Sequence, residues 1–415
     1  PSDGAVTGSP NGPRGGVAAA GPDVGLYPSV EFDADGNLHA AYFARTGPNE
    51  NLLVYARGTR GSTGAFSWTT VVADPLPGAG YYTDIVVQAD GRPLIAYAVP
   101  ALRGDDGVYR SAVRVAQPDT ATPTATEAFG NFTLAQIDLN IACGGTCAGR
   151  ERCRLDLNEC AVPARASSCE DCGDGGCFEN ADGTFACSEI GQALPGLPVL
   201  YYGTGVFLDA EILASGEIAV AWYDHVGGNL MYVQANTGNF TPADAVVLDG
   251  QADGPMGPVD TGDTGWYPDL FVAGDGAVWI SYADHGLGAL RVLEMATMVS
   301  TAVDEGVQCF ERDEESGGCL APFVSRVGYD SAFAESATGV FLVYQDASFH
   351  TIIEASLGEF GWTRDRTVAS GGDPYTGAYG FYTGHGTSTK GRYVVTQRLN
   401  QRTTPPSREV VVIGR

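Results

Sequence analysis

The sequence predicts an all-β fold, a six-bladed β-propeller, and three observations favour it. Hydrophobic residues make up 44% of the chain and charged residues 18%, with 57 Gly and 23 Pro, a balance typical of many short strands and turns around a large core. Between Gly265 and Glu294 the runs LFVA, VWISYAD and ALRVLE are short, β-branched or aromatic, and separated by Gly or Asp. This unit recurs along the chain.

Six copies of the unit follow one another, beginning at Gly25, Gly80, Gly205, Gly265, Val327 and Gly377. The spacings between them are 55, 125, 60, 62 and 50 residues, and the long interval contains a cysteine cluster. A period of roughly 50–60 residues is in the range of propeller blades. The sequence therefore predicts a propeller over 17–139 and 191–415, a Cys-rich insertion over 140–190, and a flexible N-terminal lead over 1–16.

The sixth copy has only three clear strands before Arg415. The segment GVAAA at 16–20 stands where an outer strand would precede the first copy. We expect this segment to complete the last blade and close the ring, because closure hides strand edges that would otherwise pair with other chains.

The net charge of −27, with a single lysine at Lys390, predicts repulsion from nucleic acid. No apolar run approaches the twenty residues of a membrane span. The cysteine content is typical of an oxidising compartment. We therefore expect a secreted or cell-surface protein whose partner is an extracellular protein, a glycan or a second copy of the chain.

Ten cysteines occur, and eight of them lie in the insertion. They form two four-cysteine units, each too small to bury a stabilising core, so the sequence predicts disulfides. Cys309 and Cys319 are expected to close an acidic loop between the fourth and fifth copies. The eight cysteines of the insertion are Cys143, Cys147, Cys153 and Cys160 in the first unit and Cys169, Cys172, Cys177 and Cys187 in the second.

Two pieces of the insertion, Asp156-Leu-Asn158-Glu159-Cys160 and Cys177 to Cys187, resemble parts of calcium-binding EGF-like modules. The resemblance implies calcium at Asp156, Asn158 and Glu159. The Cys169-x2-Cys172 pair has zinc as its other interpretation.

Two Asp-His pairs occupy equivalent positions 60 residues apart, and an aspartate alone occupies that position in the next copy. Imidazole and carboxylate bind divalent metals, so one hypothesis is a shared metal site that His385 would complete. The other is that each Asp closes a β-turn and each His lies on the surface. The residues are Asp224, His225, Asp284, His285 and Asp346.

A second series of polar residues lies five positions into the copies. Because inner strands border a propeller's channel, these oxygens could surround the axis and hold calcium or water, or they could cap backbone amides. The residues are Ser29, Asp84, Asp209, Asp269 and Ser331. Calcium is the favoured cation because oxygen ligands far outnumber the five histidines.

Aromatic residues recur at one repeat position, which predicts packing between blades; they are Tyr27, Tyr82, Phe207, Tyr267, Tyr329 and Tyr379. The tryptophans are candidates for sugar stacking, although a strand Trp is more often core. They are Trp68, Trp222, Trp266, Trp279 and Trp362.

The repeat resembles a family of exported bacterial propeller repeats with the theme G-x-Y-P-S/D, D-x-x-G, Y-x-D, L-x-Y-A and W-T. It is distantly similar to sialidase propellers, whose turns carry S-x-D-x-G-x-x-W. The nearest stretches here, Ser62 to Trp68 and Ser356 to Trp362, lack that Asp.

The chain has no G-x-S-x-G, H-E-x-x-H, phosphate-loop or CxxCH motif. The main prediction is therefore a non-enzymatic binding or assembly module that binds a divalent cation. The alternatives are a polysaccharide-active hydrolase or lyase, by analogy with other propellers, and a self-assembling surface-layer or filament subunit.

Overall fold

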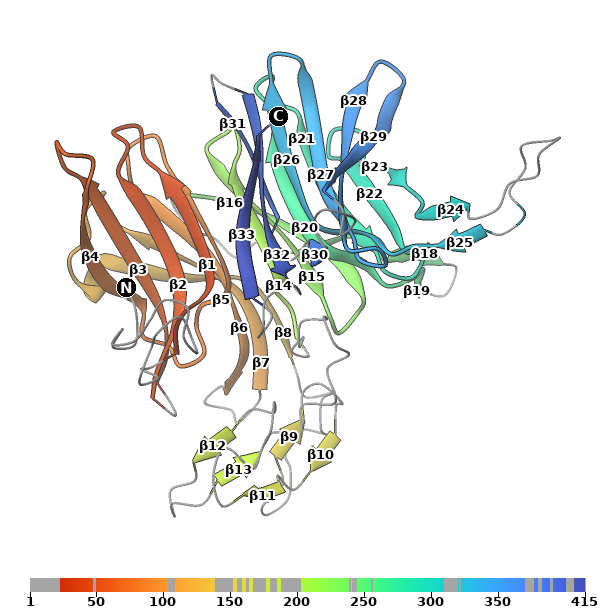
Figure 1. Cartoon of the computed structure of the whole chain (residues 1–415). Coiled ribbons are helices and arrows are strands. Elements are labelled where there is room, and N and C mark those ends of the chain that lie inside the picture. Colours follow the sequence, from red (N-terminus) through yellow and green to blue (C-terminus); the bar gives the residue numbers. More distant parts are fainter. Residues whose placement is uncertain are drawn as a thin grey trace. The chain divides into compact units, whose positions relative to one another are not determined.

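The structure is a computed structural model (Figure 1). It describes residues 23–47, 50–103, 109–138, 152–154, 159–161, 164–166, 177–179, 185–187, 203–238, 240, 245–254, 257–309, 320, 322–369, 377–379, 383–388, 391–400 and 407–414. Regular structure in these ranges is β-strand, apart from one 3₁₀ turn, η2 (Thr126–Ala128). The six successive sheet repeats form the six-bladed β-propeller that the sequence predicts.

The chain divides into two compact units. Unit 1 is Pro1–Ala210 with Gly238–Asp244, and unit 2 is Glu211–Thr237 with Ala245–Arg415. The division falls within β14 (Val206–Ile212). Among the described residues, no helix has the length and apolarity needed to cross a membrane.

Unit 1 contains two complete four-stranded antiparallel sheets with the strands in chain order. The first is β1 (Asp23–Phe32), β2 (Leu38–Gly47), β3 (Glu50–Arg60) and β4 (Phe66–Asp74). The second is β5 (Tyr81–Val87), β6 (Pro93–Arg103), β7 (Tyr109–Pro118) and β8 (Phe129–Asp138).

Unit 2 continues the same pattern. The third repeat contributes β15 (Glu217–Asp224), β16 (Asn229–Asn236) and β17 (Val246–Asp249). The fourth is β20 (Thr264–Val272), β21 (Val278–Asp284), β22 (Ala289–Glu294) and β23 (Val299–Asp304). The fifth is β26 (Val327–Ser336), β27 (Gly339–Asp346), β28 (Thr351–Gly358) and β29 (Gly361–Ala369). Two hairpins lie between repeats: β18 (Gln251–Gly254) with β19 (Gly257–Asp260), and β24 (Val307–Cys309) with β25 (Pro322–Val324).

The sixth sheet is built from β30 (Gly377–Tyr379), β31 (Gly384–Ser388), β32 (Gly391–Asn400) and β33 (Ser407–Gly414). Both β30 and β31 pair with β32, so together they occupy the place of one strand, and β33 pairs with β32 as well. The segment expected to complete this blade, 16–20, lies outside the described residues. Closure by the N-terminus stays a prediction.

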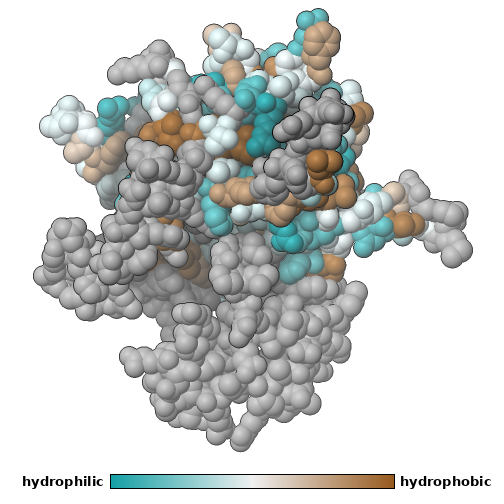
Figure 2. Space-filling view, turned by 45° about the vertical axis from the view of Figure 1, so that its right-hand side comes forward, coloured by the Kyte–Doolittle hydropathy of each residue, from teal (hydrophilic) through white to brown (hydrophobic). Residues whose placement is uncertain are grey.

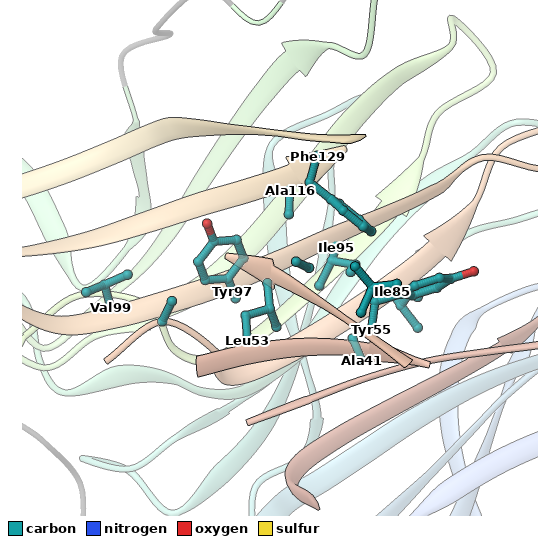
Figure 3. Packing of buried hydrophobic residues seen from close by; sticks show 12 residues of the cluster. Ala41, Leu53, Tyr55, Ile85, Ile95, Tyr97, Val99, Ala116 and Phe129 are labelled. Atoms are coloured by element: carbon teal, nitrogen blue, oxygen red, sulfur yellow. The ribbon is translucent and has the colours of Figure 1, made fainter. Parts of the chain in front are cut away.

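In the first five repeats the second strand is buried on both faces over most of its length. In β15 every residue from Ile218 to Asp224 is buried, which explains the continuous apolar run IAVAWY. Such a run is typical of a strand covered on both sides. Figure 3 shows the equivalent packing in unit 1, where Leu53, Tyr55, Ile95 and Tyr97 meet between the first two sheets.

The innermost strands share a bulge with a positive φ on a bulky residue. Tyr27, Tyr82, Phe207 and Tyr267 have φ between 46° and 53°, each two positions after a glycine that also has positive φ. At Gly265 a Cβ would lie 2.5 Å from the Leu230 Cα, so this position requires glycine. The sequence predicts that these aromatics pack between blades. The structure shows in addition that each of the four stands at a strained backbone position, which recurs from repeat to repeat.

A hydroxyl–carboxylate pair ties consecutive blades together. Tyr97 Oη donates to Asp74 Oδ2 at 2.5 Å in unit 1, and in unit 2 Tyr344 Oη donates to Asp304 Oδ2 at 2.8 Å. In each case the tyrosine lies on the second strand of one blade and the aspartate ends the last strand of the preceding blade. Burial of the two tyrosines raises their pKa, so both remain protonated donors.

In the insertion the structure describes five short strands, β9 (Arg152–Arg154), β10 (Glu159–Ala161), β11 (Ala164–Ala166), β12 (Cys177–Glu179) and β13 (Phe185–Cys187). The backbone register places Cys153 opposite Cys160 and Cys177 opposite Cys187. Opposed positions suit cross-strand bridges. The predicted disulfides and the EGF-like character stay predictions.

Some exposed apolar side chains lie opposite one another across paired strands, as Val395 does with Val412 and Val307 with Val324. Figure 2 shows hydrophobic residues interspersed among hydrophilic ones on the face in view.

Candidate functional site

The three repeated aspartates close the turns that follow the second strands. Asp224 Oδ2 accepts from Gly227 N at 3.1 Å, and Asp284 Oδ1 accepts from Leu287 N at 2.9 Å. Asp346 Oδ1 accepts from Ser348 N and Phe349 N at 3.0 and 3.1 Å. All three are buried. Their contacts match the turn-closing hypothesis.

A shared metal site from these residues is not assembled in the part of the chain that the structure describes. No three His, Cys, Asp or Glu side chains gather there in a way that would hold a metal ion. His385 lies on β31, where burial and nearby Arg392 lower its pKa to about 4. Asp156 and Asn158 fall outside the described residues, and for Glu159 only the backbone is described. Calcium stays a prediction.

In unit 1 the predicted channel residues link neighbouring inner strands. Ser29 Oγ accepts from Ile85 N at 3.2 Å and donates to Asp84 Oδ1 at 2.6 Å. Asp84 Oδ2 accepts from Ala210 N at 3.0 Å, and the Asp209 side chain also hydrogen-bonds to Asp84. Burial, the dominant influence, raises the Asp84 pKa. These oxygens therefore cap backbone amides of the next blade, as one of the two hypotheses expected.

The same rule holds in unit 2 and corrects one assignment. Asp269 Oδ2 accepts from Phe333 N at 2.7 Å. In the fifth repeat the positive φ falls on Asp330, so Ala332, not Ser331, is equivalent to Asp269. Ser331 instead bonds to Ser281 Oγ at 2.8 Å. The sequence alignment was shifted by one residue because Tyr329 resembles the aromatic of the other copies.

Another group of polar residues in unit 2, around Asp263, was not predicted from the sequence. Asp263 directly precedes β20, and its carboxylate accepts three bonds. Tyr223 Oη and Trp266 Nε1 donate to Oδ1, each at 2.8 Å, and His285 Nδ1 lies 3.0 Å from Oδ2. Local backbone bonds hold the loops: Gly286 N donates to Asp263 O and Thr264 N to Gly228 O.

The second nitrogen of His285 faces an arginine. Arg326 Nη1 lies 3.4 Å from His285 Nε2. A guanidinium only donates, so Nε2 accepts and the ring proton sits on Nδ1, directed at Asp263. In this tautomer the orientation of the imidazole is fixed by a carboxylate and its lone pair is on Nε2, the arrangement of an oriented general base.

Aromatic rings fix the plane of this imidazole. The Trp266 ring stacks on His285 with centroids 4.4 Å apart and 11° between planes, and Tyr329 lies 6.4 Å away. Trp266 is 8% exposed and Trp222 fully buried, so both pack rather than present an open platform. The His285 and Asp263 side chains are 23% and 36% exposed. The polar atoms of His285 and Asp263 are therefore accessible to solvent, while the Trp266 ring that stacks on His285 is buried.

The Asp263 carboxyl is held ionised. Partial burial works to raise its pKa, but the hydrogen bonds from His285, Trp266 and Tyr223 outweigh it and lower the pKa below 3.8. Asp263 is therefore an acceptor that orients His285, not a proton donor.

One sequence signal could have revealed these residues. Two positions before the repeat glycine, the second and third copies have Gly78 and Gly203, whereas the fourth and fifth have Asp263 and Arg326. The first copy also carries a charge there, Asp23, so the signal is an acidic and then a basic residue at this position in two successive copies.

No protein-family model matches the chain, and no curated protein matches it. Among solved structures, an ulvan lyase is similar with a TM-score of 0.47 and 10% identity, over 93% of this chain and 78% of that one. An α-L-arabinofuranosidase from Fusarium graminearum has a TM-score of 0.44 and 10% identity, over 94% and 93%. One from Lactobacillus brevis has 0.37 and 10%, over 94% and 90%. At these identities the similarity concerns the fold alone.

These findings correct the main functional prediction. The similar structures are by name enzymes that cleave glycans, not binding or assembly modules. The prediction of a non-enzymatic binding or assembly module was wrong. The sialidase resemblance is not confirmed.

Proposed function

We propose that this protein is a polysaccharide-active enzyme whose reaction takes place at Asp263, His285 and Arg326. The observation that carries the proposal is the Asp263–His285 pair: a carboxylate 3.0 Å from Nδ1, with the Nε2 lone pair turned toward a cation. The arrangement supplies a base and a positive charge at one place.

The substrate class follows from where these groups lie. The reactive atoms sit on loops at strand ends, with His285 and Asp263 partly exposed and Arg326 exposed. A long polymer can reach groups at the surface without entering a closed cavity. An exported protein, as the sequence predicts, meets polysaccharides of this kind. Arabinan, arabinofuranosides and ulvan, the glycans named for proteins similar in fold, serve as first probes.

The test is product release from a polysaccharide panel. The full chain is incubated with neutral and uronate-containing polymers, and new reducing ends are counted. We expect cleavage of at least one polymer by the native chain and a loss of roughly 10²–10⁴-fold for His285→Ala, the range for removing a general base. If no polymer gains reducing ends, or if His285→Ala cleaves as fast as the native chain, the proposal is wrong.

A further inference from the structure

We propose that the reaction is β-elimination on uronate-containing polysaccharides, with His285 as the base and Arg326 as the group that binds the substrate carboxylate. This inference rests on the proposed function and names its substrate class and bond chemistry. It comes from the charge states and hydrogen bonds around Asp263.

Hydrolysis would need a different set of groups. Most glycoside hydrolases use two carboxyl groups, one protonated to assist the leaving oxygen and one ionised. Asp263 accepts three hydrogen bonds and stays ionised. Asp284, the other carboxyl beside it, is 6% exposed, bonds Leu287 N and lies 3.8 Å from Arg291. Neither of these two residues offers an accessible acid.

Elimination needs only the groups that are present. In a 4-linked uronate the C5 hydrogen lies next to the carboxylate. His285 Nε2 takes the C5 proton, the C–H electrons form the C4=C5 double bond, and the C4–O bond breaks with its electrons on the leaving oxygen. Water protonates that oxygen, and the imidazolium returns its proton to solvent. No oxidant or reductant is required.

Arg326 has two roles in this scheme. In the free protein its Nη1 lies 3.4 Å from His285 Nε2 and occupies the lone pair of that nitrogen. A substrate carboxylate is a stronger partner for a guanidinium than an imidazole is, because it accepts two charge-assisted bonds. Binding of the uronate therefore draws Arg326 away from Nε2 and frees the base. The paired carboxylate also loses negative charge, which makes the adjacent C5–H more acidic.

The overall charge of the chain adds a consequence for salt dependence. At −27 the protein repels a polyanion at long range, while Arg326 attracts its carboxylate at contact. The Debye length falls from about 30 Å at 0.01 M salt to about 10 Å at 0.1 M, so added salt removes repulsion before it weakens the contact pair. KM for a uronate polymer should therefore fall over that range.

A matched pair of substrates tests the inference. Polygalacturonate, alginate and a glucuronate-containing polymer are each compared with the same polymer after its carboxylates have been reduced to alcohols. Reducing ends and the ultraviolet absorbance of the conjugated C4=C5 bond are both measured. We expect one double bond per new reducing end on a uronate polymer and no cleavage of its reduced form.

The outcomes separate the two proposals. Reducing ends without double bonds, or equal cleavage of reduced polymers, would overturn elimination and leave the polysaccharide-active proposal standing. No reducing ends with any polymer would overturn both.

The role of the arginine has its own test. Arg326→Ala should raise KM roughly ten- to hundredfold, the value of a charge-assisted bond, and Arg326→Lys should recover part of the loss. Arg92→Ala, at a partly exposed arginine paired with Asp90, is the control expected to leave KM unchanged. Equal KM values for Arg326→Ala and Arg92→Ala would contradict the assigned role.

Discussion

The turns after β15 and β21 have nearly the same sequence and different surroundings. Both carry Asp-His, and in both the aspartate closes the turn while its carbonyl accepts an amide four residues on, from Gly228 or Gly288. Each histidine stacks on an aromatic ring, His225 on Tyr223 at 5.8 Å and His285 on Trp266 at 4.4 Å. The repeat therefore fixes the turn but not the function.

The surroundings of the two turns differ because of the loops that precede the first strand of each repeat. In the fourth repeat Asp263 precedes β20 and bonds His285, and in the fifth Arg326 precedes β26 and faces the other ring nitrogen. The third repeat has Gly203 at the equivalent position. The His285 turn therefore lies between Asp263 and Arg326, whereas the loop preceding the third repeat has a glycine at this position.

Removing the Asp263 carboxylate should give the largest loss among the supporting residues. In Asp263→Asn the amide no longer accepts the Nδ1 proton as a charged partner, so the neutral ring can place its proton on Nε2. We expect kcat to fall by roughly 10²–10⁴-fold. Because Asp263 acts through His285, the diagnostic readout is ¹⁵N NMR of the ring: the Nδ1–H tautomer should be lost at His285 and unchanged at His225. A retained tautomer would refute the positioning role.

The turn aspartates should behave alike in stability and differ in activity. Asp224→Ala and Asp284→Ala each remove an acceptor for turn amides, at a cost of about 1 kcal/mol of unfolding free energy. Only Asp284→Ala changes the turn that carries His285. Urea unfolding and initial rates should therefore show two equally destabilised proteins, of which one is slower. Equal slowing in both would remove the distinction between the turns.

Acid should distinguish Asp263 from Asp284 by the sign of its effect. The folded pKa of Asp263 is lowered, so its contribution to stability is present above about pH 4 and is lost as pH falls through the folded value. Burial raises the pKa of Asp284, so protonation of this group favours the folded state as pH falls through its raised value.

Melting curves of Asp263→Asn and Asp284→Asn between about pH 6 and pH 3 check these signs. Relative to the native chain, Asp263→Asn should lose less stability on acidification and Asp284→Asn should lose more. The same pH response in both variants would show that the two carboxyls have similar environments.

The fold could be predicted from the sequence because its signals are local and repeated. Apolar runs such as VWISYAD predict the strands. Gly265 and the equivalent glycines of the other copies mark where each repeat begins. The register of the fifth copy was misplaced because its aromatic, Tyr329, directly follows Gly328, whereas in the other copies the bulge aromatic stands two residues after the glycine. Only the backbone φ shows that Asp330 forms the bulge in this copy.

The candidate site was only half predictable. His285 was identified from its repeated Asp-His pair, but its partners were expected among the equivalent aspartates. A short aspartate side chain bonds the amides of its own turn, so those carboxylates are already engaged. The true partners, Asp263 and Arg326, come from loops 22 residues before and 41 residues after His285, a proximity set by blade packing and not by any sequence period.

The most direct measurement is kcat for His285→Ala and His225→Ala on one cleaved uronate polymer. Both variants remove the same side chain from equivalent turns, so any shared effect on folding cancels, and melting temperatures verify that they match. The account predicts a loss of roughly 10²–10⁴-fold for His285→Ala and less than about twofold for His225→Ala. Equal rates in the two variants would contradict the claim that Asp263 and Arg326 turn one of two like turns into a catalytic site.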